Sequence, residues 1–154
     1  MKTDYMQPFI DASTMVINQV TGFTVSNGEI YEKEKPYLSD HIIVLIGMTG
    51  QISGNVVIAF EKETAFALAS AMMMGMPVNE LDEMASSALG ELCNMILGNA
   101  VTLLSQKDIV IDITPPGILT GDNMKLSIHK SNIISVPLNL NDGHKLEIDI
   151  SYEI

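Results

Sequence analysis

The stretch that decides the fold runs from Leu81 to Gln106 and reads LDEMASSALGELCNMILGNAVTLLSQ. Its apolar residues recur at steps of three and four, which is the period of an amphipathic helix. That apolar stripe consists of Leu81, Ala85, Ala88, Leu92, Met95, Ile96 and Leu103, and Met84 and Leu89 widen it. Asn79 precedes the segment as a candidate N-cap, with the acidic Asp82 close behind it. We therefore predict one long helix whose apolar face packs on the core.

A second stripe on the same helix carries the candidate chemistry. Ser87, Glu91, Asn94 and Gly98 follow at steps of four, three and four, so they cover only about 60° of the helix circumference. Glu91 offers a fixed charge, and the carboxamide of Asn94 offers donors and an acceptor that can hold a water molecule. Two interpretations stay open: a docking and catalytic stripe, or an ordinary solvated helix face.

Two glycines lie inside this predicted helix. Gly90 and Gly98 each cost about 1 kcal/mol relative to alanine in a helix interior. Such costs indicate that something approaches the helix closely. The approaching group is either a binding partner or a neighbouring helix or strand of the same chain.

Size and charge limit the classes of function. The chain has 154 residues, which predicts one domain over residues 1–154. Its net charge is −11, and it contains no arginine, the side chain that best grips phosphate and guanine. We therefore expect neither nucleic-acid binding nor attachment to an anionic membrane surface.

Cysteine and histidine usage gives further expectations. Cys93 is the single cysteine, so an internal disulfide is excluded and a reducing cytoplasm is expected. The residues after Met1 show no apolar signal segment, and we therefore expect no signal peptide. A small packed residue is the favoured interpretation of Cys93, with a nucleophile as the alternative. The three histidines, His41, His129 and His144, are scattered. We therefore expect no metal site and no cofactor of the chain's own.

The remaining patterns predict an α+β domain with a mostly antiparallel sheet covered by helices. Helical spacing covers residues 6–20 and 62–74, and strand patterns cover residues 23–31, 40–48, 52–60, 108–113, 124–128, 134–140 and 146–154. Gly54 inside a strand indicates a bulge or a close backbone approach. The order of elements suggests two similar halves.

A methionine cluster ends the predicted helix over residues 62–74. It consists of Met72, Met73, Met74 and Met76. We favour core filling or an interface for it, and the alternative is an adaptable binding surface.

The last strand suggests a route to a dimer. Residues 145–154 alternate strictly between polar and apolar, and Pro137 limits pairing on a neighbouring strand. We expect an exposed sheet edge here, which is a template for a strand from a second copy. The alternative is a monomer whose edge is guarded by Lys145, Glu147, Asp149 and Glu153.

The order of these motifs resembles that of the CheC/CheX/FliY family of chemotaxis phosphatases, and the amino-acid sequence of the motifs is most similar to the CheX-like branch. The resemblance rests on SALGELCNM from Ser87 to Met95, on DITPP from Asp112 to Pro116, and on Thr49-Gly50 followed by Gly54. It covers nearly the whole chain. The proline pair follows Asn94 at a slightly shorter spacing than in CheC. The resemblance implies a CheC-like fold with two pseudo-repeated halves.

The resemblance also implies a function. Such proteins dephosphorylate the aspartyl phosphate of CheY-like response regulators, whose own Mg²⁺ neutralises the phosphoryl oxygens. Asn94 would orient the attacking water, Glu91 would dock on a receiver lysine, and Ser87, Gly98 and Pro116 would contact the partner. The first helix has Asp11 and Thr14 where two-site members carry a second Glu-x-x-Asn, so that half is expected to have lost its site.

One alternative belongs to another class of function. The domain could be a non-catalytic dimeric interaction module that binds a receiver or a flagellar switch component.

CheX-like proteins form homodimers, so the resemblance implies a homodimer for this chain as well.

Overall fold

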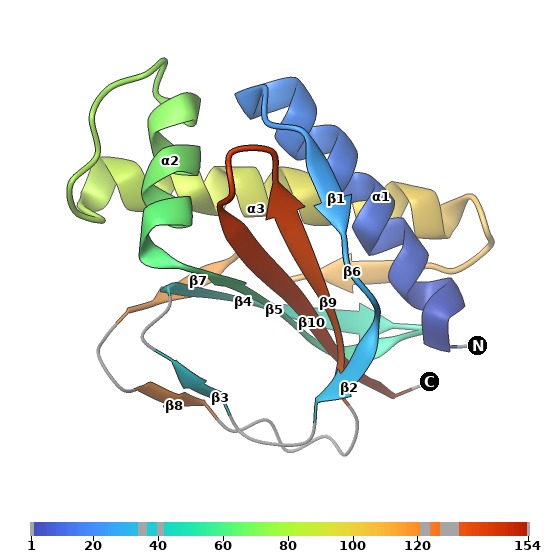
Figure 1. The fold of residues 1–154 in the computed structure, drawn as a ribbon. Coiled ribbons are helices and arrows are strands. Elements are labelled where there is room, and N and C mark those ends of the chain that lie inside the picture. The colour runs from blue at the N-terminus through green and yellow to red at the C-terminus, as the bar shows by residue number, and fades with distance from the viewer. Residues whose placement is uncertain (1, 34–36, 40–41, 121–123, 127–132, 154) are drawn as a thin grey trace.

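The computed structural model describes residues 2–33, 37–39, 42–120, 124–126 and 133–153. In this part of the chain, helices cover one face of an antiparallel sheet, and a small two-stranded sheet lies on the side away from the helices (Figure 1). The helices are α1 (Lys2–Thr21), α2 (Lys62–Met72) and α3 (Glu83–Ser105). The strands are β1 (Val25–Asn27), β2 (Tyr31–Lys33), β3 (Tyr37–Ser39), β4 (Ile42–Gly50), β5 (Ser53–Phe60), β6 (Ile111–Ile113), β7 (Gly117–Leu119), β8 (Met124–Leu126), β9 (Ile133–Leu140) and β10 (Lys145–Glu153).

The main core lies between the helices and the sheet. Val44 and Ile46 of β4 pack in one buried cluster with Leu89, Leu92 and Ile96 of α3. On the other face of the sheet, a smaller cluster contains Ile43, Val57 and Ile133. Because β4 is covered on both faces, nearly every residue from Ile42 to Met48 is apolar. The buried strand predicted over residues 40–48 is thus confirmed for its described part.

The sheet order is β1-β9-β10-β5-β4-β6, with β2 also paired to β9 and β7 also paired to β4. Every strand pair in the described sheets is antiparallel. This confirms the α+β class and the mostly antiparallel sheet. The division into two repeated halves stays a prediction.

The predicted exposed edge over residues 145–154 is wrong. Strand β10 pairs with β5 from Leu146 to Glu153 and with β9 from Lys145 to Ser151, so it lies inside the sheet. Asp149 and Ser151, which alternation assigned to solvent, are buried. The alternation of polar and apolar residues predicts which face of the sheet each side chain lies on, but it does not predict whether a strand pairs with one neighbouring strand or with two. The described edges are β1 with β2, and β6 with β7, and the homodimer itself stays a prediction.

Pro137 lies where the outer neighbour of β9 is interrupted. β1 pairs with Leu138–Leu140 of β9, and β2 pairs with Ile133–Ser135. The N–H of Gly28 donates to the Pro137 carbonyl at 2.9 Å. In an antiparallel strand the N and O of one residue point to the same side. The missing N–H of Pro137 therefore lies on the side of Gly28, at the break between β1 and β2 and away from β10.

The bounds of several elements differ from the predictions, and some short strands were not predicted. α1 begins at Lys2, so Pro8 lies inside the helix and not in its first turn. α2 ends at Met72, and the N–H of Gly75 closes it by donating to the Ser70 carbonyl at 2.8 Å. β7 was not predicted, because its three residues are too few to show a period.

α3 also passes a simple test for a membrane span, because its most apolar window has a mean hydropathy of 1.3. In the described part of the chain it is the one helix that does so. Leu89, Leu92 and Ile96 of this helix have no exposed surface. The apolar composition of α3 is therefore explained by its place in the protein core.

Gly54 is a position where the backbone approach excludes a side chain. Its φ is +152°, and an added Cβ would lie 1.9 Å from the carbonyl oxygen of Ser151 on the paired strand β10. The predicted close backbone approach at Gly54 is confirmed. We expect Gly54→Ala to lower the free energy of unfolding by about 3 kcal/mol or more, because β5 must move away from β10. Urea unfolding measures this loss, and an unchanged midpoint would contradict the register of these two strands.

Candidate active site

The candidate site begins with the N-terminus of α3. Asp82 is the N-cap, and its Oδ1 accepts a hydrogen bond from the Ala85 N–H at 2.9 Å. Asn79, the predicted cap, lies outside the helix. Asp82 takes that role because its side chain reaches the free N–H of Ala85, the third residue of the helix. The Asp82 cap fixes where the helix begins and hence which residues share each face.

The buried face of α3 sets the rotation of the helix. Leu92, Cys93 and Ile96 are fully buried, whereas Glu91 and Asn94, which flank Leu92 and Cys93, are exposed. Ser87 and Gly98 are exposed as well. The four residues predicted to form a polar stripe are therefore all accessible on one side of the helix.

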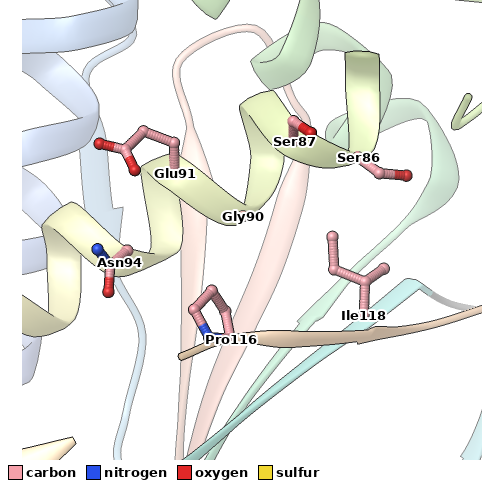
Figure 2. A pocket seen from close by; sticks show the side chains of 7 residues that line it. All are labelled: Ser86, Ser87, Gly90, Glu91, Asn94, Pro116 and Ile118. Atoms are coloured by element: carbon pink, nitrogen blue, oxygen red, sulfur yellow. The ribbon is translucent and has the colours of Figure 1, made fainter. Parts of the chain in front are cut away.

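A groove of about 460 Å³ runs along this stripe. Figure 2 shows α3, which carries Gly90, on one side of the groove and the segment with Pro116 and Ile118 on the other. The lining consists of Ser86, Ser87, Gly90, Glu91, Asn94, Pro116 and Ile118. The structure thus brings four of the predicted site residues together, namely Ser87, Glu91, Asn94 and Pro116. Gly98 is not part of the lining.

The wall opposite α3 is held by the edge of the sheet. β6 and β7 both pair with β4, and the turn between them carries Pro116. Thr114 anchors this turn to Gly47 by two bonds: its N–H donates to the Gly47 carbonyl at 3.0 Å, and its Oγ1 accepts from the Gly47 N–H at 2.8 Å. One backbone and one side-chain hydrogen bond of Thr114 therefore hold the segment that carries Pro116 opposite Gly90 of α3.

Sequence reasoning missed two lining residues, Ser86 and Ile118. Ile118 belongs to β7, which was too short to predict. Ser86 precedes Ser87 on α3, and the Ser86 hydroxyl donates to the Leu81 carbonyl at 3.3 Å. No signal in the sequence pointed to either residue.

The two glycines of α3 have different surroundings. A Cβ on Gly90 would lie 3.8 Å from Cγ of Pro116 and 3.9 Å from Cδ1 of Ile118, which is ordinary contact. A Cβ on Gly98 would meet nothing within 4 Å. A neighbouring strand of the same chain therefore lies beside Gly90, whereas the described chain supplies no close neighbour for Gly98.

The polar groups of the site are available to a partner. Within the described part of the chain, the side chains of Glu91 and Asn94 have no hydrogen-bond or ion-pair partner. They lie one turn apart, so their Cβ atoms are about 5–6 Å from one another. One carboxylate and one carboxamide can hold a cationic group and a water molecule side by side.

Cys93 does not belong to the site. Its side chain is fully buried, and this burial raises the pKa of the thiol far above its usual range. A thiolate is the nucleophilic form, so Cys93 is inert at neutral pH. The interpretation as a small packed residue is confirmed. Among the described residues, no group of three or more His, Cys, Asp or Glu side chains is arranged to hold a metal ion.

Known proteins resemble both the sequence and this geometry. A family model described as chemotaxis phosphatase CheX matches residues 42–139, which include the whole groove. The chain belongs to the CheX family. It is 33% identical over 135 residues to a Thermotoga maritima protein named CheY-P phosphatase CheX, covering 88% of this chain and 86% of that relative. This confirms the resemblance of the sequence to the CheX-like branch.

Solved structures give the same fold for this CheX-family chain. A CheC-like superfamily protein from Shewanella sp. PV-4 has a TM-score of 0.88 and 28% identity, with full coverage of both chains. A CheX from Borrelia burgdorferi, in a complex described as CheX-CheY-BeF3-Mg+2, has a TM-score of 0.82 and 31% identity. That match covers 97% of this chain and 98% of the Borrelia chain.

Gly98 gives a test of the open surface on α3. We expect Gly98→Ala to raise the free energy of unfolding by about 1 kcal/mol, because alanine favours the helix and its Cβ meets no other atom of the chain. Urea unfolding of both proteins measures the difference. A loss of stability would show that Gly98 packs closely against part of its own chain.

Proposed function

We propose that this CheX-family protein hydrolyses the aspartyl phosphate of a CheY-like response regulator. The observation that carries the proposal is the exposed pair Glu91 and Asn94, which lines the groove and has no partner within the described chain. The Thermotoga relative is named a CheY-P phosphatase. The Borrelia relative was crystallised with CheY, BeF3 and Mg2+, and a beryllium fluoride stands in for a phosphoryl group.

In this mechanism, Asn94 positions the attacking water. Its carboxamide enters the receiver active site and hydrogen-bonds a water molecule in line with the phosphorus–oxygen bond to be broken. Water attacks phosphorus, the bond to the aspartyl oxygen breaks, and the receiver carboxylate and inorganic phosphate are released. Phosphoryl transfer of this kind depends mainly on positioning and on stabilising charge. The carboxylate is a good leaving group, so this chain need not supply a general base.

Glu91 fixes the register of docking. Its carboxylate pairs with a lysine of the receiver active site in a charge-assisted bond. Asn94 lies one turn further along the same helix, so this ion pair also sets the depth to which the carboxamide enters. The Mg²⁺ that neutralises the phosphoryl oxygens belongs to the receiver, and this chain brings no cofactor of its own.

The other stripe and groove residues make room for the partner. Gly98 presents no side chain and lies beyond the groove along the same stripe. Pro116 forms the rigid wall opposite Gly90. Ser87 is exposed one turn before Glu91 and shapes the entrance to the groove. In our proposal these three residues contact the receiver but take no part in the chemistry.

Asn94→Ala should abolish the acceleration of receiver dephosphorylation, with a fall in kcat of about 100-fold, because the water is no longer oriented. The fold should remain intact, since Asn94 is exposed. Decay of a receiver phosphorylated with acetyl phosphate measures the rate, and circular dichroism checks the fold. Asp11→Ala and Thr14→Ala on α1 are the controls and should keep wild-type activity. A fully active Asn94→Ala variant would overturn the mechanism, and a large loss in either control would indicate a second site.

Glu91→Gln should act mainly on docking. The substitution keeps the shape of the side chain and removes its charge, so we expect KM to rise about tenfold or more. Sodium chloride should raise the KM of the wild-type protein, because ions screen the pair, and should affect Glu91→Gln less. Initial rates at several salt concentrations measure both effects. Equal salt dependence in the two proteins would exclude an ion pair at Glu91.

A further inference from the structure

A second pocket lies beside the active-site groove, between the loop after α2 and the first turn of α3. Its volume is about 190 Å³, which compares with about 150 Å³ for an apolar cavity that holds benzene. Its lining includes Met73, Met76, Met84, Glu80 and Asp82. This methionine pocket is large enough for one bulky apolar side chain, and none of these residues takes part in the proposed mechanism.

The methionines around this pocket are exposed to an unusual degree. The side chains of Met74, Met76 and Met84 are 98%, 53% and 60% exposed. They lie close together in the chain, whereas scattered single apolar residues are ordinary on a protein surface. Methionine is flexible and polarisable, and it is common on surfaces that adapt to a partner. For Met74 and Met76 of the predicted methionine cluster, exposure excludes core filling. Met84, which the spacing assigned to the apolar stripe of α3, is exposed as well, so that assignment is wrong.

The backbone at Met74 gives independent support. Its φ is 60°, in the left-handed region that favours glycine at a helix end. With its side chain almost fully exposed, Met74 gains no packing within its own chain that offsets this strain. Backbone strain without internal compensation is typical of positions that serve binding. A methionine here therefore destabilises the isolated protein and is available for a contact outside it.

The charges around the pocket specify the chemistry of the occupant. Residues 63–106 contain five acidic residues and no lysine, arginine or histidine. Two of the acids, Glu80 and Asp82, line the pocket itself. Because Asp82 caps α3, the negative charges that can face a partner are those of Glu80 and the exposed Glu83. A matching partner surface presents an apolar side chain next to lysine or arginine.

We propose that the methionine pocket is a second docking point for the same CheY-like receiver, and this rests on the proposed function. Met84 precedes Ser87 by three residues and so continues the stripe of Glu91 and Asn94. Along the helix axis it lies about 10 Å from Glu91 and about 15 Å from Asn94. A standard interface buries about 800 Å² on each partner, and a circular patch of this area has a radius of about 16 Å. A receiver centred on the groove therefore reaches the pocket.

The two contact points have different roles. Asn94 acts on the reacting phosphoryl group and therefore determines kcat. The methionine pocket is remote from that chemistry and holds the receiver equally before and during the reaction, so it contributes uniform binding and lowers KM. Because methionine adapts to the shape of its partner, the pocket accepts an apolar receiver side chain without a rigid fit.

Two substitutions and a matched control test this proposal. Met84→Ser removes one wall of the pocket, and Met74→Gly removes the exposed side chain while relieving the left-handed backbone. The control is Val110→Ser, because Val110 is 63% exposed and follows the C-terminal end of α3, the end opposite Met84. The measurements are initial rates of receiver dephosphorylation against receiver concentration, the melting temperature and the molar mass by light scattering.

We expect the double variant Met74→Gly with Met84→Ser to raise KM about tenfold and to leave kcat within about twofold of wild type. Met74→Gly alone should raise KM while raising Tm by about 2–4 °C, which separates lost docking from lost folding. Val110→Ser should keep the wild-type KM. Wild-type KM in both methionine variants overturns the docking point and leaves the phosphatase function standing.

Two other outcomes also overturn the proposal. If the wild-type protein is a dimer that Met84→Ser dissociates, the pocket belongs to an interface with a second copy of this chain. If the wild-type protein does not accelerate receiver dephosphorylation, the proposed function fails and the docking point fails with it.

Discussion

The burial of one face of α3 is the constraint on which the rest of the structure depends. Leu89, Leu92 and Ile96 are fully buried against the sheet, and burying a side chain of this size contributes about 1.5–3 kcal/mol. The backbone hydrogen bonds of the helix couple these residues to Glu91 and Asn94. Anchoring the apolar face thus fixes the direction of the polar face, and the site is presented by a rigid element with no loop to order.

The sheet supplies the other half of the site by positioning Pro116. Backbone pairing of β6 and β7 with β4 carries the turn with Pro116 to α3, and the Thr114–Gly47 bonds hold that turn in place. β4 also contributes Val44 and Ile46 to the core under α3. One strand therefore fixes both walls of the groove relative to each other. A change that shifts β4 moves Pro116 and the helix together.

Periodicity predicted the parts of this protein that depend on local sequence. The three helices, the β4–β5 hairpin and the exposure of Glu91 and Asn94 follow from spacing, because a helix or strand face repeats at a fixed interval. Spacing did not predict which strands pair with β10, and it did not predict β7 or its groove-lining residue Ile118. Strand pairing joins residues far apart in the chain, as in Lys145 with Asn139 on one side and Leu146 with Phe60 on the other. The family motif, and not the spacing, gave the expected chemistry.

A site made of one exposed carboxylate and one exposed carboxamide is incomplete until a partner covers it. In water, an ion pair at Glu91 is screened and contributes little. In the mechanism that we propose, the receiver excludes water from the groove, so that the same charge interacts more strongly and the water held by Asn94 is isolated from bulk solvent. In the proposed mechanism, therefore, the docking that selects the receiver also creates the environment for hydrolysis. Surface contacts outside the groove then affect the rate of hydrolysis only by changing the fraction of the protein that is in this covered complex.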